Sequence, residues 1–160
     1  MGAGKSTIGP LLARILSWDF VEMDRLIEKA IGLSVSEIFK ERGEPFFREE
    51  EARVARSLAG REKVVIATGG GAFAQPGTRE VLAEGAFIVW LKAPFHTLSS
   101  RVDRGPSRPL ALDRATMQKL WEERDPFYRQ ADFVVETADT TPAAVARQIA
   151  ERIQGGRPES

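Results

Sequence analysis

The apolar residues of the chain follow two spacings, one typical of helices and one typical of buried strands. Between Lys5 and Ser17 they recur every three or four residues, which predicts a helix with one buried face. Short β-branched runs predict buried strands, with further helical patterns between and after them. Strands are expected at 20–21, 64–67, 87–91 and 133–135, and helices at 5–17, 26–31, 34–42, 45–59, 78–83, 95–104, 115–128 and 142–153.

Strands that alternate with helices predict a parallel sheet with helices on both faces, so the expected fold class is α/β. Ser34 and Glu37 form a capping box that starts a helix, and Thr141 is the expected cap of the last helix. A chain of 160 residues suits one domain, which we expect over residues 1–154. The tail 155–160, rich in glycine and proline, is expected to be disordered.

Composition and charge exclude several classes of protein. The 23 lysines and arginines balance 23 aspartates and glutamates, so the chain lacks the basic field that general nucleic-acid binding requires. There is no cysteine and one histidine, His96, which argues against disulfides and zinc sites. No apolar run is long enough to span a bilayer, and the first residues do not form a signal peptide. We therefore expect a soluble cytoplasmic protein that binds neither nucleic acid nor membrane.

The first seven residues carry a phosphate-binding pattern. They match the second half of the Walker A motif G-x-x-x-x-G-K-[ST], and they lead directly into an amphipathic helix. In this motif backbone amides and the helix N-terminus bind phosphate oxygens, the lysine reaches the β and γ phosphates, and the serine ligates magnesium. The pattern predicts ATP and Mg²⁺ as cofactors, bound by Gly2, Ala3, Gly4, Lys5, Ser6 and Thr7. A glycine-rich tail that happens to precede a helix is the plainer alternative.

Only the second half of the motif lies in this chain. Its first glycine would sit two residues before Met1, and the strand that feeds such a loop would lie before that glycine. In P-loop kinases that strand is central, so a chain without it leaves two strand edges unpaired. We expect that the natural protein is longer, that Met1 is an internal methionine of the loop, and that the first central strand is absent from this chain.

An ordered series of motifs follows the loop. It comprises Phe20-Val21-Glu22-Met23-Asp24, Ile27-Glu28, Ile38-Phe39, Gly43-Glu44, Phe47-Arg48, Glu50-Glu51, Gly69-Gly70-Gly71, Arg108-Pro109-Leu110 and Tyr128-Arg129. In order and spacing, from Met1 to about Ile153, the series resembles the shikimate kinase family. The resemblance implies a parallel sheet of strand order 2-3-1-4-5. It also implies transfer of the γ-phosphoryl group of ATP to the 3-hydroxyl of shikimate, giving 3-phosphoshikimate and ADP.

The resemblance implies roles for the acidic residues near the loop. Asp24 follows a predicted strand and would orient or deprotonate the attacking hydroxyl, with Lys5 as a second catalytic residue. A helix N-cap is the plainer interpretation of Asp24. The family usually has Asp-x-Asp here, whereas this chain has Glu22 two residues before Asp24. Glu22 is therefore expected to reach magnesium through water, beside Ser6.

The resemblance also implies the residues that bind shikimate. Arg48 and Arg129 would hold its carboxylate, because each arginine presents a planar fork of donors. Glu51, three residues after Arg48, could pair with it. Gly70 and Gly71 would let the ring approach the backbone. The plainer interpretations are that both arginines are solvated surface groups and that the glycines form an ordinary strand-to-helix turn.

Residues 103–113 resemble the family's lid and are expected to form a mobile loop. Closing the loop would exclude water and bring Arg108 onto the transferring phosphoryl group, which makes Arg108 both catalytic and nucleotide-binding. Arg101 is expected beside the adenine. An ordinary surface loop with a solvated arginine is the alternative.

Two other functions remain open. The chain could be a ligand-sensing domain of the same fold from a transcription regulator, although such a domain needs no lid arginine. It could also be another small-molecule P-loop kinase, and gluconate, which carries a carboxylate, is the strongest competing acceptor. Nothing in the sequence implies a protein partner, so a monomer is expected.

Overall fold

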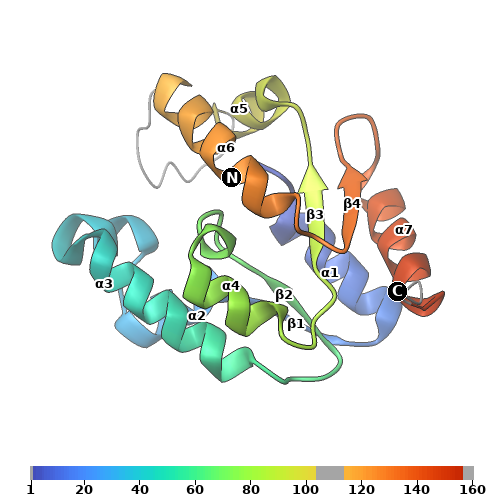
Figure 1. The fold of residues 1–160 in the computed structure, drawn as a ribbon, viewed down its shortest axis with the longest axis horizontal. Coiled ribbons are helices and arrows are strands. Elements are labelled where there is room, and N and C mark those ends of the chain that lie inside the picture. The colour runs from blue at the N-terminus through green and yellow to red at the C-terminus, as the bar shows by residue number, and fades with distance from the viewer. Residues whose placement is uncertain (1, 104–113, 157–160) are drawn as a thin grey trace.

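The computed structural model describes residues 2–103 and 114–156, in which strands and helices alternate along the chain. Helices lie on both sides of the strands (Figure 1), which confirms the α/β prediction. The elements are α1 (Lys5–Leu16), β1 (Asp19–Glu22), α2 (Met23–Ile31), α3 (Val35–Leu58), β2 (Val64–Ala67), η1 (Ala72–Ala74), α4 (Pro76–Ala83), β3 (Val89–Lys92), α5 (Phe95–Asp103), α6 (Arg114–Tyr128), β4 (Phe133–Glu136) and α7 (Pro142–Gln154).

The strands form two separate parallel pairs. β1 pairs with β2, with Asp19 opposite Val64, and β3 pairs with β4, with Val89 opposite Phe133. Over the described residues each pair is a two-stranded sheet of its own. In the family order 2-3-1-4-5 these pairs are strands 2-3 and 4-5. In that order the position of strand 1 falls between β2 and β3.

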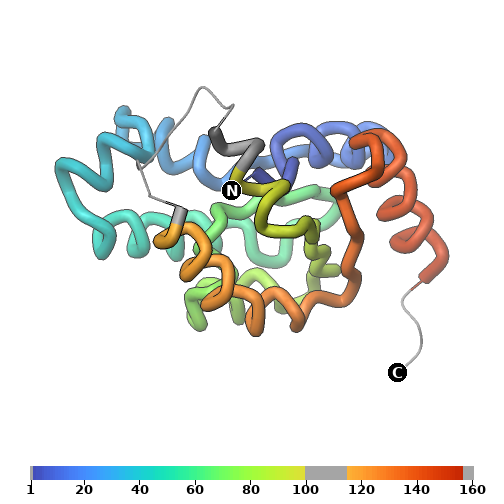
Figure 2. The backbone as a smooth tube through the Cα atoms, turned by 90° about the horizontal axis from the view of Figure 1, so that it is seen from above, coloured from blue at the N-terminus to red at the C-terminus, as the bar shows by residue number. Residues whose placement is uncertain are grey.

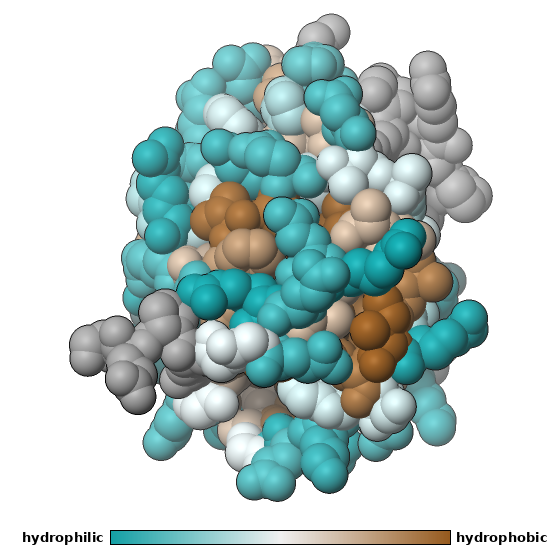
Figure 3. Space-filling view, turned by 90° about the vertical axis from the view of Figure 1, so that its right-hand side faces the viewer, coloured by the Kyte–Doolittle hydropathy of each residue, from teal (hydrophilic) through white to brown (hydrophobic). Residues whose placement is uncertain are grey.

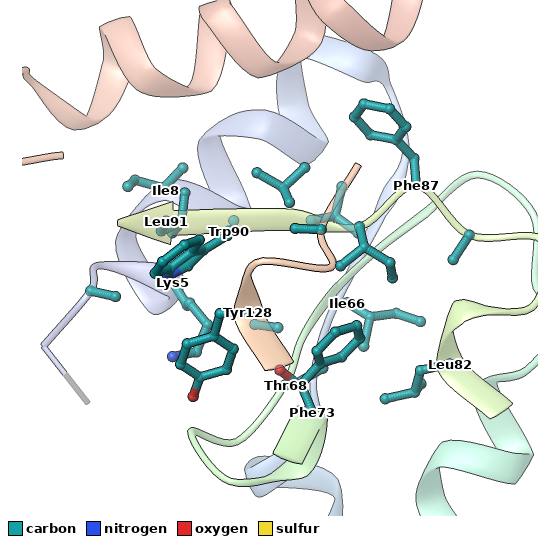
Figure 4. Close-up of a pocket in the computed structure, with 18 of the residues that line it drawn as sticks. Lys5, Ile8, Ile66, Thr68, Phe73, Leu82, Phe87, Trp90, Leu91 and Tyr128 are labelled. Carbon is teal, nitrogen blue, oxygen red and sulfur yellow. The ribbon is translucent and has the colours of Figure 1, made fainter. Parts of the chain in front are cut away.

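A cavity of about 860 Å³ lies between β2 and β3. We call it the slot. Its walls are mainly apolar and come from both strands and from α1, with Ile66, Leu91 and Ile8 among the lining residues (Figure 4). Lys5 and Tyr128 lie at one end of the slot, while Leu82 and Phe87 lie toward the other (Figure 4). The slot therefore leads from an apolar interior to the phosphate loop.

Each strand pair has its own apolar core. One core joins α2 and α3 and contains Met23, Ile27, Ile38, Phe47, Val54 and Leu58. The other joins α1, β4 and α7 and contains Ile8, Leu12, Val135, Val145 and Ile149. α1 lies beside α7 both in the ribbon of Figure 1 and in the backbone tube of Figure 2. Because each large buried aliphatic or aromatic side chain contributes about 1.5–3 kcal/mol, these cores supply most of the stabilising burial.

The helix starts agree well with the sequence patterns. The Ser34 side chain accepts from the Glu37 amide while the Glu37 carboxylate accepts from the Ser34 amide, which confirms the capping box. The Thr141 side chain caps α7 by accepting a hydrogen bond from the Ala144 amide. Each such cap stabilises a helix by about 1 kcal/mol.

Several boundaries differ from the predictions: α2 begins at Met23 rather than 26, and α4 begins at Pro76 rather than 78. The helices expected at 34–42 and 45–59 are confirmed as the two parts of α3, which meet at a kink where Gly43 has a non-helical φ of 81° and ψ of 169°. β3 begins at Val89, later than the expected 87, because apolar character does not mark where strand pairing begins.

The surface carries no extensive apolar area on the face shown in Figure 3, where small brown areas are separated by hydrophilic side chains. Among the described residues the exposed large apolar side chains are Ile15 and Val134. No helix in the described ranges has both the length and the apolar character needed to cross a membrane.

Candidate active site

The phosphate loop is positioned by a left-handed residue at the start of α1. Gly4 has a φ of 93°, which a residue with a side chain adopts at a cost, and its carbonyl accepts from the Thr7 and Ile8 amides. α1 then begins at Lys5, so its N-terminus faces the phosphate loop. That end of a helix attracts anions such as phosphate.

The two residues expected to serve magnesium are in contact. The Ser6 hydroxyl donates a hydrogen bond to Glu22 Oε1, although the two residues are sixteen positions apart. A hydroxyl beside a carboxylate suits magnesium, which keeps several waters and needs few protein ligands. The described residues contain no cluster of three or more histidine, cysteine or acidic side chains that could hold a metal by themselves.

Lys5 and Asp24 lie close enough to influence each other's ionisation. Burial lowers the pKa of Lys5, and the carboxylates of Asp24 and Glu22 act in the opposite direction. Burial likewise raises the pKa of Asp24, and the charge of Lys5 opposes that shift. Asp24 lies in the first turn of α2, whose N-cap is Glu22, so the structure does not use Asp24 as an N-cap.

Asp24 meets a second buried carboxylate at the glycine run after β2. A Cβ atom built on Gly69 would lie 2.8 Å from Asp24 Oδ1 and 3.0 Å from Glu51 Oε1, so glycine makes room for both acids. Neither of these two oxygens has a hydrogen-bond partner among the described residues. Burial raises the pKa of Glu51, although the neighbouring charge of Arg48 opposes this. Unpaired buried acceptors at one place indicate a site for a hydroxyl-bearing ligand.

Arg48 is held against the same glycine run. Its Nη1 donates to Glu51 Oε2 at 2.8 Å, which confirms the predicted pairing of these two residues. A Cβ on Gly71 would lie 2.6 Å from Arg48 Nη2, and the Phe47 ring centroid lies 5.4 Å from Arg48 Cζ. These contacts leave the guanidinium little freedom to turn.

α6 contributes Tyr128 and Arg124 to the lining of the slot. The Tyr128 hydroxyl donates to the carbonyl of Gly70. Burial raises the pKa of Tyr128, whereas the charge of Arg124 and a hydrogen bond with it act to lower that pKa. Arg124 also lines the slot, and its charge acts on both Lys5 and Glu51.

Arg129 is not brought to this cluster. Its side chain is 72% exposed and pairs with Asp125, which lies in the last turn of α6. Arg124, which the sequence analysis did not name, lines the slot instead and acts on Tyr128. Helical spacing could have indicated it, because Arg124 lies four residues before Tyr128 and so on the same face of α6, whereas Arg129 follows the end of that helix.

The remaining predicted residues fall into two groups. Ala3 and Gly70 line the slot, Gly71 lies against the Arg48 guanidinium, and Gly2 lies against the backbone of Leu98. Arg108 and the lid predicted at 103–113 lie outside the described residues, apart from Asp103 at the end of α5. Arg101 belongs to α5, but its side chain is outside the described part of the chain.

Together these features define a class of protein. A phosphate loop, its lysine, a serine and carboxylate for magnesium, and an aspartate near a partly buried arginine are the parts of a small-molecule P-loop kinase. A family model described as shikimate kinase matches residues 1–154. The chain belongs to the shikimate kinase family.

Individual relatives agree with this assignment. The chain is 43% identical over 159 residues to a shikimate kinase of Halorhodospira halophila, covering 97% of this chain and 90% of the relative. It is 41% identical over 156 residues to the shikimate kinase of Moorella thermoacetica, and the match covers 96% of this chain and 90% of that relative.

Solved structures show the same fold. The structure of shikimate kinase from Acinetobacter baumannii in complex with shikimate superposes with a TM-score of 0.92 at 34% identity, covering 99% of this chain and 91% of that one. The structure of shikimate kinase from Aquifex aeolicus superposes with a TM-score of 0.85, also at 34% identity, and the match covers 97% of this chain and 92% of that one.

Proposed function

We propose that this chain is a shikimate kinase, which transfers the γ-phosphoryl group of ATP to the 3-hydroxyl of shikimate and releases 3-phosphoshikimate and ADP. The observation that carries the proposal is the position of Asp24 and Arg48 against one glycine run, with Lys5 beside Asp24. An acceptor with a hydroxyl near Asp24 and a carboxylate on Arg48 would span this run.

Asp24 would accept the hydrogen bond of the attacking hydroxyl and take its proton. Burial raises the pKa of Asp24, which makes its carboxylate a better proton acceptor than an exposed aspartate. Lys5 would bind the β and γ phosphates and balance the charge that moves during transfer. Such a reaction depends on positioning and electrostatic stabilisation rather than on a covalent enzyme intermediate.

The acceptor carboxylate would be bound by Arg48 and, in place of Arg129, by Arg124. Both arginines border the glycine run, directly in the case of Arg48 and through Tyr128 and Gly70 in the case of Arg124. Two planar forks set around one carboxylate favour acceptors that carry this group.

Magnesium would be held by the Ser6 hydroxyl, with the Glu22 carboxylate contacting the hydrated ion. When bound, it neutralises charge on the β and γ phosphates. We further propose that Arg108 closes onto the phosphoryl group with the lid at 103–113, that Arg101 lies beside the adenine, and that residues 1–154 act as one cytoplasmic, monomeric domain with a disordered tail at 155–160.

Shikimate-dependent ADP formation with ATP and magnesium tests the proposal. We expect Asp24→Asn to lower kcat by about 100-fold or more, since positioned general bases contribute at least this factor. Asp139→Asn, an exposed change of the same kind, is expected to leave kcat unchanged.

A folded, ATP-binding protein without shikimate-dependent turnover would contradict the proposal. Turnover with gluconate in its place would support the alternative acceptor. Binding of shikimate without any turnover would support the sensing domain.

A further inference from the structure

The guanidinium of Arg48 is satisfied on two sides by carboxylates of its own helix. On one side Nη1 donates to Glu51 Oε2. On the other side Nε and Nη2 both donate to a single oxygen, Glu44 Oε1, at 3.1 and 2.9 Å. The edge formed by Nε and Nη2 is the one best shaped to grip a carboxylate with two parallel hydrogen bonds. In this structure that edge is held by Glu44.

The two carboxylates are unequal in their freedom to move. The Glu51 side chain has no exposed surface, whereas that of Glu44 is 59% exposed. Glu51 could break its hydrogen bond to Arg48 only if the buried side chains packed around α3 moved apart. Glu44 can rotate into solvent and be hydrated there, so its hydrogen bonds to Arg48 are replaceable at low cost.

The backbone places Glu44 for this contact. Gly43 interrupts α3, and Glu44 follows it directly, one helical turn before Arg48. Residues four apart on a helix face each other, so a glutamate at this position reaches the arginine without strain. Gly71 and Phe47 restrict the guanidinium, which keeps its Nε and Nη2 edge directed at whatever carboxylate lies there.

We propose that Glu44 is a built-in competitor for the acceptor's carboxylate. In the empty site it occupies the Nε and Nη2 edge of Arg48, and it turns into solvent when the acceptor's carboxylate takes that edge with two oxygens. Glu44 thereby sets the affinity for carboxylate-bearing acceptors and keeps uncharged polyols off Arg48, because a hydroxyl displaces a carboxylate poorly. This inference rests on the proposed function in taking shikimate as the acceptor.

Replacing Glu44 by glutamine tests the inference. Glu44→Gln keeps the shape of the side chain and removes its charge, so the acceptor meets a weaker competitor. We expect KM for shikimate to fall about two- to fivefold, the range that corresponds to one exposed ion pair, with kcat unchanged. The matched control is Glu41→Gln, which removes the same charge from the same helix at a residue that forms no ion pair with Arg48 within the described ranges.

An unchanged or raised KM in Glu44→Gln would overturn the inference, since Glu44 would then be inert or would hold Arg48 in place for the acceptor. A fall in KM of equal size in Glu41→Gln would also overturn it, because general electrostatics would account for the effect.

A second measurement separates this inference from the kinase assignment. The Nε–H signal of Arg48 in a nitrogen-15 NMR spectrum, assigned by its loss in Arg48→Lys, is titrated with acetate in the absence of nucleotide. Tighter acetate binding in Glu44→Gln than in the unsubstituted protein supports the competitor, even if no shikimate is phosphorylated. Equal binding in both proteins contradicts the inference, even if shikimate is phosphorylated.

Discussion

At the scale of single residues, the site depends on glycines that leave room for charged side chains. Gly69 and Gly71 admit the acids and the arginine that face the acceptor position. The sequence showed these glycines and the pairing of Arg48 with Glu51, because both follow from local spacing. It did not separate Arg124 from Arg129, since motif order places an arginine near Tyr128 but says nothing about which helix face it occupies.

Arg124 of α6 and Arg129, which follows that helix, make a direct comparison. Arg124→Lys keeps the charge and removes the planar fork, so we expect KM for shikimate to rise about tenfold or more. Arg129→Lys changes an exposed side chain paired with Asp125, and its KM is expected to stay within about twofold of the parent. Steady-state kinetics on the two variants measures both KM values. A larger rise in KM for Arg129→Lys than for Arg124→Lys would indicate that Arg129 is the residue that binds the carboxylate.

The raised pKa of Asp24 has a consequence for stability. Burial disfavours its carboxylate in the folded protein, so ionised Asp24 lowers the free energy of unfolding at neutral pH. We expect Asp24→Asn to raise that free energy by about 1 kcal/mol at pH 7. The gain should shrink as pH falls through the raised pKa, because the folded carboxyl group then takes up a proton.

Urea unfolding at several pH values measures this effect. Asp139→Asn serves as the control and is expected to change the free energy of unfolding by less than about 0.5 kcal/mol at any pH. A loss of stability in Asp24→Asn at pH 7 would show that the carboxylate is satisfied in the folded protein.

At the scale of elements, local signals predicted the helices better than their connections. The apolar period and the caps at Ser34 and Thr141 located helix starts closely. The break in α3 at Gly43 was predictable, because glycine and proline in Gly43-Glu44-Pro45 are the ordinary signal for a break. The packing of α3 against α2 and α4 was not, because no local signal specifies which helices lie side by side.

The kink in α3 can be tested by one substitution. Gly43 has a φ of 81° and a ψ of 169°, a region that is essentially limited to glycine. Gly43→Ala is therefore expected to lower the free energy of unfolding by about 2 kcal/mol and to raise KM for shikimate, since Glu44 and Arg48 follow the kink. Thermal and urea unfolding measure the first effect, and kinetics the second.

Gly77→Ala is the matched control for Gly43→Ala. Gly77 lies inside α4, and an added Cβ would meet nothing within 4 Å. We expect this change to stabilise the protein by about 0.4–1 kcal/mol. If both variants lost the same free energy of unfolding, the backbone conformation of Gly43 would not explain the loss in Gly43→Ala.

At the scale of the whole molecule, the strands of the described residues form two separate pairs. Local periodicity predicts four strands but cannot order them, and the strand order came from the family resemblance. Within each pair, the hydrogen-bonding pattern shows which backbone amides point at the partner strand and which point away from it. The Asp19 amide donates to the Lys63 carbonyl and the Phe133 amide to that of Ile88, so alternate residues of β2 and β3 bond to their partner strands and the others face the slot.

Hydrogen exchange should therefore alternate along β2 and β3. Amides directed at the partner strand are expected to exchange at least about tenfold more slowly than amides directed at the slot. The slow set is Val65, Ala67, Trp90 and Lys92, and the fast set is Val64, Ile66, Val89 and Leu91. Exchange followed by two-dimensional NMR measures both sets, and uniform protection along either strand would mean that its second edge is covered in solution.

The slot also determines how the protein responds to hydrostatic pressure. Unfolding a protein with internal void volume decreases the volume of the system, so pressure favours states in which the voids are filled by water. Here the void lies between two small cores rather than within one. Compression should therefore part the β1–β2 half from the β3–β4 half before it unfolds either core, with α1, which contacts both β2 and α7, as the last link between them.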